Sequence, residues 1–261
     1  MASREEAPRD FAPADLPDFR RGLFLPRRDP YWLGRIPCPP RVLLLTDSTL
    51  AIVTHPSDPT APVHIRLPAI SSLETGNMML LGWMEIGAGG AWHKVEYNTR
   101  CSGPIDDFRR ELRRSIFEPV QPGCTEAVHF GDAFDDIKFS RAGAYELDQG
   151  ENVAVTFLSL PRRRTSKHWL KLREAWQPGD LVICTDRRFL WITDRYNGRY
   201  ERYGRVVRSL RRRDIRAVSM RREDRGAALS IRSDAHEWTI AVDDELEAAA
   251  TEFAGAAHEP R

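Results

Sequence analysis

The residues with the clearest chemical potential are the arginines concentrated between Arg187 and Arg225. This span contains 14 arginines, no lysine and five acidic residues, so its formal charge is +9. Such a concentration of positive charge attracts phosphates, nucleic acid and acidic protein surfaces, and the guanidinium group suits phosphate and carboxylate equally. The alternative is a set of solvated strand faces and loops, partly neutralised by the acidic segment 118–151. Arg187 and Arg188 are the residues of this span that we expect to contact a ligand.

A second basic cluster lies in the sequence RRRTSKHWLKLR at 162–173. Its candidate ligand contacts are Arg162, Arg163, Arg164, Lys167, Lys171 and Arg173. Trp169 lies among them, and its amphipathic ring would be favoured at a membrane interface. The alternative is that Trp169 is a packing residue, as aromatic side chains commonly are, and that the basic residues are solvated.

Three tyrosines, Tyr196, Tyr200 and Tyr203, alternate with arginines in RYNGRYERYG at 195–204. Aromatic rings interleaved with arginine stack the bases of single-stranded nucleic acid. The same sequence predicts a hairpin with Asn197-Gly198 at its turn. A nucleic-acid-binding protein that uses the Arg/Tyr-rich region 187–225 is therefore the alternative function.

Residue types suited to catalysis or metal binding form no recognisable pattern in this sequence. The histidines are scattered without HExxH, and there is no GxSxG, no P-loop and no GxGxxG after a strand. The cysteines lack zinc-site spacing; they are Cys38, Cys101, Cys124 and Cys184. The expectation is a non-catalytic protein with no cofactor and no metal site.

The elements that must position the basic residues occur twice along the chain. Residues 39–54 read PPRVLLLTDSTLAIVT and residues 178–193 read PGDLVICTDRRFLWIT, with Thr46-Asp47 and Thr185-Asp186 at the same place in each. Two short apolar runs around an Asp-containing turn predict a β-hairpin. Further strand-like runs follow each hairpin, and an amphipathic helix is predicted after them, at 103–116 and at 244–254. The chain is therefore expected to use one small domain twice.

This order of elements resembles bacterial PH-like and GRAM-type domains, here as two tandem copies. The segments LLLTDSTLAIV at 43–53 and VICTDRRFLWI at 182–192 are similar to the LTxxRL hairpin of those domains. The second copy has Arg187-Arg188-Phe189 in the basic-basic-apolar positions, whereas the first departs from the pattern with Ser48-Thr49-Leu50. The resemblance implies an α+β, mainly β fold of two PH-like barrels, each a bent antiparallel sheet of about seven strands capped by a C-terminal helix.

The same resemblance suggests where a ligand would bind. In lipid-binding PH domains the loop between the first two strands supplies basic residues for inositol phosphates, and 162–173 would be that loop here. The superfold also hosts peptide binding and purely structural roles, so function does not follow from the fold.

The expected domain organisation follows from these elements. It is a disordered arm at 1–20, a PH-like domain at 21–117, a linker with a short helix at 118–150 and a second PH-like domain at 151–256. No apolar run approaches the roughly 18 residues of a membrane span, and the N-terminal segment lacks the apolar core of a secretory signal. A cytoplasmic protein is expected.

The predicted function is that of a non-catalytic binding or scaffold module. Its second domain would recognise an acidic partner, which could be a protein surface, a phosphorylated ligand or an anionic lipid. Peripheral membrane contact is included in this prediction, and a transmembrane segment is not.

Overall fold

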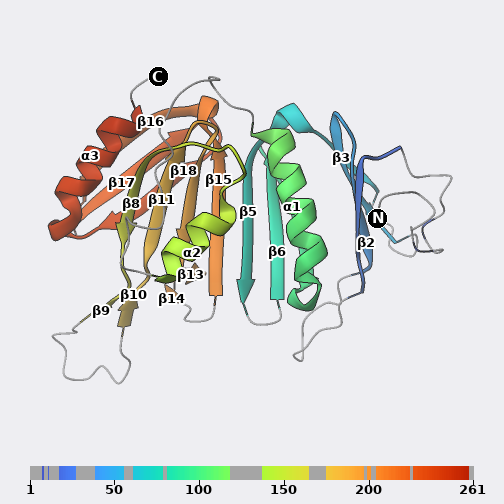
Figure 1. Ribbon diagram of the computed structural model, residues 1–261, viewed down its shortest axis with the longest axis horizontal. Helices are drawn as coiled ribbons and strands as arrows, with labels where there is room; N and C mark the ends of the chain where they lie inside the picture. Colours follow the sequence, from blue (N-terminus) through green and yellow to red (C-terminus); the bar gives the residue numbers. More distant parts are fainter. Residues whose placement is uncertain are drawn as a thin grey trace. The chain divides into compact units, whose positions relative to one another are not determined.

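Figure 1 shows a computed structural model of the chain. The structure describes Pro8, Phe11 and residues 18–27, 39–55, 61–78, 81–117, 137–164, 175–196, 199–200, 204–223 and 226–258. The chain divides into two compact units, one formed by Met1–Ser71 and Met79–Ile116 and the other by Ser72–Met78 and Phe117–Arg261. The fold is mainly β with a C-terminal helix, which confirms the predicted fold class at this level.

The first unit contains a four-stranded antiparallel sheet in the order β1-β2-β3-β4. Its strands are β1 (Arg21–Leu25), β2 (Arg41–Leu45), β3 (Thr49–Thr54) and β4 (Val63–Arg66). The predicted first hairpin is confirmed, since β2 pairs with β3 and Leu45 faces Leu50 across the turn. β2 is buried on both faces, which explains why it is a continuous apolar run rather than an alternating one.

A second hairpin and a helix complete the first unit. Strands β6 (Leu81–Ala88) and β7 (Ala91–Asn98) are joined by Gly89-Gly90. Both glycines have positive φ, of 57° and 82°, as the tight two-residue turn of a hairpin requires. Helix α1 (Ser102–Ile116) contacts β1 and buries an apolar stripe at the predicted spacing. The stripe consists of Ile105, Phe108, Leu112 and Ile116.

One residue of the N-terminal arm packs against the first sheet. Phe11 is buried with Val42, Leu44 and Ala51, and its ring meets that of Phe24 edge to face. The remainder of the expected disordered arm up to residue 17, apart from Pro8, lies outside the described residues.

The second unit is built on an antiparallel sheet in the order β5-β15-β12-β11-β8. Its strands are β5 (Ile70–Met78), β8 (Val153–Ser159), β11 (Asp180–Thr185), β12 (Arg188–Thr193) and β15 (Gly204–Arg211). β11 and β12 form the predicted second hairpin. Residues 72–78 of β5 come from the sequence range that the prediction gave to the first domain, and they belong to the second unit because they pair with β15.

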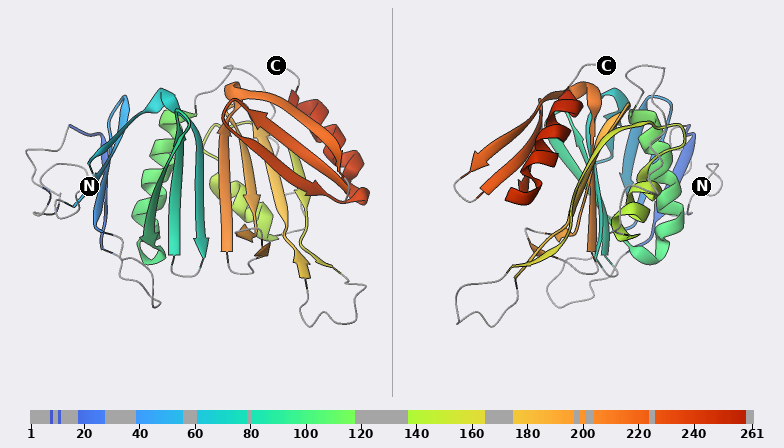
Figure 2. Two further views of the ribbon diagram at one scale, coloured as in Figure 1. Left: turned by 180° about the vertical axis from the view of Figure 1, so that it is seen from behind. Right: turned by 60° about the vertical axis from the view of Figure 1, so that its left-hand side comes forward.

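A three-stranded sheet and two helices cover that five-stranded sheet. The small sheet has the order β16-β17-β18, with β16 (Ile215–Glu223), β17 (Gly226–Ser233) and β18 (Glu237–Val242). Together with helix α3 (Glu247–His258) it encloses a core that includes Phe157, Phe189 and Phe253. Helix α2 (Ile137–Glu146) covers the opposite face of the five-stranded sheet through Phe139 and Ala142 (Figure 2). β11 and β12 are buried throughout because both of their faces are covered.

Two short ribbons interrupt the second half of the chain. β9 (Arg162–Arg164) pairs with β10 (Ala175–Gln177), and β13 (Arg195–Tyr196) pairs with β14 (Arg199–Tyr200). The strands of the described residues form open sheets, none of which closes into a barrel. No helix in the described part of the chain is both long and apolar enough to cross a membrane.

Candidate functional site

The Thr-Asp turn of the second hairpin is held together by the hydroxyl of Thr185. This hydroxyl accepts the backbone N–H groups of Arg187 at 3.1 Å and Arg188 at 3.0 Å. In the first hairpin, the Thr46 hydroxyl accepts the N–H groups of Ser48 at 3.2 Å and Thr49 at 2.9 Å. The shared threonine therefore has a structural role in both turns, because it fixes the backbone that connects two strands.

The aspartate of the same turn ties the second hairpin to the start of β8. The Asp186 carboxylate accepts the backbone N–H of Asn152 at 3.0 Å and its side-chain N–H at 3.2 Å. The backbone N–H of Asp186 donates in return to the Asn152 carbonyl at 2.9 Å. These bonds place the turn beside the segment that follows α2.

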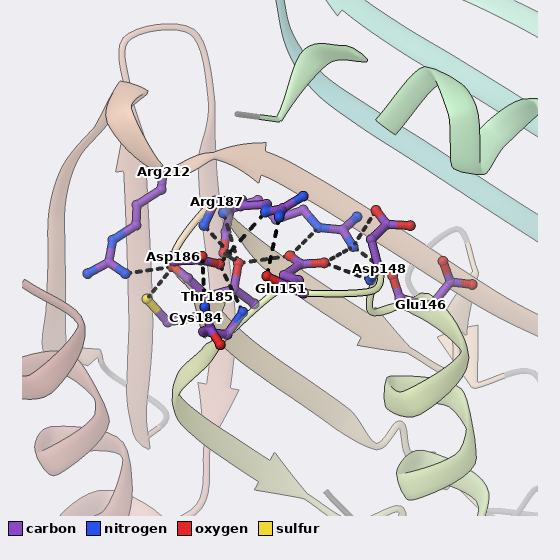
Figure 3. A network of polar contacts seen from close by, with 11 residues as sticks. Glu146, Asp148, Glu151, Cys184, Thr185, Asp186, Arg187 and Arg212 are labelled. Carbon is purple, nitrogen blue, oxygen red and sulfur yellow. Dashed lines mark hydrogen bonds and ion pairs between the residues drawn. The ribbon is translucent and has the colours of Figure 1, made fainter. Parts of the chain in front are cut away.

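A network of polar contacts links the Thr185-Asp186 turn to Glu146, Asp148 and Glu151 (Figure 3). The buried side chain of Arg188 lies at its centre. Its guanidinium group makes two hydrogen bonds of 2.8 Å to the Glu151 carboxylate, one from Nε and one from Nη2. Nη2 also donates to the Glu146 carbonyl at 2.6 Å and lies 3.6 Å from Asp148. Nη1 donates to the hydroxyl of Ser209 at 3.2 Å. The Arg188 and Glu151 side chains are 1% and 0% exposed, so this pair has no access to an external ligand.

The network keeps Glu151 ionised despite its burial. Burial acts to raise the pKa of this carboxyl, but the charge and hydrogen bonds of Arg188, the Asp148 amide and the Thr185 hydroxyl outweigh it and lower the pKa. For Arg188, burial opposes the charged form, and Glu151, Asp148 and Glu146 outweigh it and raise the pKa. Both groups are therefore charged at neutral pH, and the pair stabilises the fold only while both partners are present.

This pair predicts a defined pH dependence of stability. Because the pKa of Glu151 is lowered in the folded state, its contribution is fully present above the ordinary value of 4.5 and is lost as the pH falls below 4.5 through the folded pKa. The stability difference between the wild type and Glu151→Gln should therefore be largest at pH 7 and shrink in acid. Urea unfolding at several pH values between 7 and 3 measures it. A difference that stays constant over this range would contradict the assignment.

Arg187, the other predicted contact in this turn, is partly buried. Its Nη2 group donates to the Gly150 carbonyl at 3.2 Å, and its Nε lies 4.0 Å from Asp186. Arg187 and Arg188 thus both make internal contacts. The contacts of these two residues do not support their predicted role in ligand binding. For Arg188, the burial of the side chain argues against that role directly.

Among the arginines of 187–225 whose side chains the structure describes, six others lie beside carboxylates. Arg208 donates to Glu74 at 2.6 Å and stacks on the Trp191 ring, with its guanidinium carbon 4.5 Å from the centroid. Arg216 makes a bidentate pair with Asp234, both bonds measuring 2.6 Å. Further pairs are Arg205–Glu146, Arg211–Asp214, Arg221–Glu237 and Arg222–Glu247. Most of these carboxylates lie outside 187–225, so the formal charge of that stretch overstates the charge of the surface.

The second predicted cluster, at 162–173, is placed on the ribbon β9–β10. Arg162, Arg163 and Arg164 form β9 and face Gln177, Trp176 and Ala175 in the backbone register. Lys167, Lys171 and Arg173 lie outside the described residues. The ribbon lies within the connection between β8 and β11. These are the first two long strands of the second copy. Residues 152–173 contain no Asp or Glu, and Glu174 is the only acidic residue between Asn152 and Gly179, so the sequence around this cluster supplies little neutralising charge.

The Arg/Tyr segment forms the hairpin that its turn sequence predicts. Arg195 pairs with Tyr200 and Tyr196 pairs with Arg199, on either side of Asn197-Gly198. Tyr203 lies outside the described residues.

Sequence reasoning did not identify one contact with catalytic residue types. The Ser72 hydroxyl and His236 Nε2 are 2.9 Å apart, and burial lowers the pKa of His236. A serine nucleophile needs access to substrate, whereas Ser72 is only 3% exposed. This contact therefore joins β5 to the turn before β18 rather than forming a reactive site. The described part of the chain contains no group of three or more His, Cys, Asp or Glu side chains that could hold a metal ion.

Comparison with known proteins assigns no family or fold to this chain. No protein family matches this chain. No curated protein and no solved structure matches it either. The site must therefore be interpreted from its own geometry.

Proposed function

We propose that this protein is a non-catalytic binding module of two PH-like domains and that the second domain recognises an anionic partner through the ribbon β9–β10. The order of elements supports the domain assignment. Among the described residues, and with the two ribbons set aside, each half of the chain supplies seven strands and then a helix. The first half runs from β1 to α1 and the second from β8 to α3.

Matching hydrogen bonds support the same duplication. The Leu67 N–H donates to the Ser48 carbonyl at 2.9 Å, and the Arg212 N–H donates to the Arg187 carbonyl at 3.0 Å. Each bond joins the hairpin turn to a 3-10 turn, at Leu67–Ala69 in the first half and at Arg212–Asp214 in the second. The two halves therefore repeat in backbone contacts as well as in sequence.

The observation that carries the binding proposal is the contrast between the ribbon and the sheets. Arginines on the sheets pair with carboxylates of the same chain, as Arg188 does with Glu151 and Arg208 with Glu74. The segment 162–177, which forms the ribbon, carries six basic residues and one acidic residue, Glu174. A basic segment of this kind favours phosphate or carboxylate groups of a partner.

The double variant Arg162→Glu with Arg163→Glu tests this proposal. Its affinity for an anionic probe should fall by about tenfold or more, since two attractive charges become repulsive. The probes are vesicles containing phosphatidylserine, a polyglutamate peptide and a 20-nucleotide single strand. The matched control is Arg100→Glu with Arg141→Glu, two exposed arginines on other elements.

The outcomes of this test separate the candidate functions. Loss of vesicle or polyglutamate binding in the ribbon variant, with the control unaffected, supports the proposal. Wild-type binding by the ribbon variant contradicts it. An affinity that rises with strand length and falls steeply with salt would favour the nucleic-acid alternative instead.

A further inference from the structure

One face of the first sheet is apolar and is covered by the N-terminal arm. An antiparallel sheet commonly leaves one face to water, so an apolar face needs a cover. Phe11 provides it and is itself 2% exposed. We call this surface the outer face; the residues that pair across its strands and pack against Phe11 are Phe24, Val42, Leu44, Ala51 and Val53.

The second copy covers the equivalent face with a helix. The sequence repeat aligns residues 42–53 with 181–192. The aligned apolar residues are Leu181, Ile183, Leu190 and Ile192, and they pack against Phe139 and Ala142 of α2. Phe11 and Phe139 both precede the first strand of their copy. The two phenylalanines therefore fill equivalent places, one from an arm and the other from a helix.

The position that holds α2 by charge has a different residue in the first copy. The Lys138 ammonium lies 2.6 Å from the buried carboxylate of Asp194. Asp194 aligns with His55 in the repeat. Their backbone N–H groups make matching hydrogen bonds, to the carbonyls of Gly179 at 3.2 Å and Pro40 at 3.0 Å. A histidine therefore stands where the second copy has the acidic partner of its covering helix.

The border of the outer face on β4 is also basic. The register places His64 opposite Ala51, with Arg66 two residues further along the same face, and both are exposed. The described strand positions on this face include no Asp or Glu. A covering segment therefore needs an acidic residue beside its aromatic anchor, as Asp10 is beside Phe11 in the sequence.

The arm is a smaller cover than α2. In its described part, Phe11 and Phe19 pack on the outer face, whereas α2 is a helix of ten residues. Pro13 and Pro17 follow Phe11 in the sequence, and proline interrupts a helix. Because the equivalent face takes a helix in the second copy, a helix that covers the outer face more fully than the arm has to come from another chain.

We propose that the outer face binds an amphipathic helix of another protein, which places an aromatic anchor where Phe11 lies and directs acidic residues toward His55, His64 and Arg66. The arm acts as an internal competitor, since Phe11 occupies the site in the free chain and leaves it when the helix binds. This site is separate from the ribbon β9–β10, and the proposal goes beyond the ribbon function.

The test uses the full chain and a synthetic peptide of residues 135–148 that carries Lys138→Glu. This peptide keeps the apolar stripe of α2 and reverses the charge before its anchor. Fluorescence anisotropy measures its affinity, and NMR of the Val42 and Leu44 methyl groups shows whether it lies on the outer face. The matched probe is the same peptide with Lys138 retained, which should bind at least about tenfold more weakly.

Two variants address the two parts of the site. Phe11→Ala should bind the peptide about tenfold more tightly than the wild type, because the internal competitor is removed. The β4 variant, His64→Glu with Arg66→Glu, should bind it about tenfold or more weakly; both side chains are exposed, so the core is unchanged. The control Arg100→Glu with Arg141→Glu should bind as the wild type does.

The wild type should itself bind, so the test does not depend on the folding of Phe11→Ala. The ribbon variant should bind this peptide as the wild type does, because the ribbon is not part of the outer face. The proposal fails if the peptide does not bind, if it shifts the Leu181 and Ile183 methyl groups instead, or if the β4 variant binds it unchanged. Unchanged affinity in Phe11→Ala would overturn the competitor role of the arm.

Discussion

Replacing Arg188 by Met is expected to lower the free energy of unfolding by about 3–5 kcal/mol, because the Glu151 carboxylate is then left buried without its partner. The side chain of Glu151 is fully buried and accepts two charge-assisted hydrogen bonds from Arg188. Methionine retains much of the arginine volume, so the loss reports on the charge rather than on a cavity. Urea unfolding at pH 7, followed by tryptophan fluorescence, measures it.

The control for this prediction removes both charges together. The double variant Arg188→Met with Glu151→Leu should be more stable than Arg188→Met alone, since no uncompensated charge remains in the interior. A single variant as stable as the wild type would show that the pair does not hold the second hairpin to the segment after α2.

Replacing Phe253 by Ala is expected to cost about 3–5 kcal/mol, the range for removing a buried aromatic side chain. Phe253 is 1% exposed on α3, and its ring packs against those of Phe157 and Phe189. These contacts join the last helix to β8 and β12, so the substitution tests whether α3 closes the core of the second unit. Thermal and urea unfolding measure the effect.

The neighbouring substitution Glu252→Ala is the matched control. Glu252 is exposed on the same helix, so its replacement should change stability by no more than about 0.5 kcal/mol. Equal effects of the two substitutions would contradict the packing role of Phe253.

The local elements of this fold were predictable from the sequence because their signals are local. The apolar runs around Thr46-Asp47 and Thr185-Asp186 predicted both hairpins, and the spacing of Ile105, Phe108 and Leu112 predicted α1. The start of the last helix was less predictable, because a 3-10 turn at Asp244–Leu246 comes before it and the Asp243 side chain makes no capping hydrogen bond to that turn.

The candidate site was predictable only in part, because charge was counted along the chain rather than in space. Glu74 is 134 residues from Arg208, and Glu151 is 37 residues from Arg188. The separation of these residues along the sequence does not predict such ion pairs. The acidic segment 118–151 was the available signal. It supplies Glu151 and Glu146 as partners of Arg188 and Arg205, whereas the carboxylates beside the other arginines, such as Glu74, lie outside it.

The pairing of β5 with β15 has a consequence for synthesis of the chain on the ribosome. Residues 72–78 emerge before their partner strand at 204–210 has been translated. At rates of roughly 5–20 residues per second, β5 therefore waits on the order of ten seconds with one backbone edge open. Because open edges template aggregation, expression yield should depend on translation speed between these strands, and truncated chains that end before residue 204 should be the ones that chaperones retain.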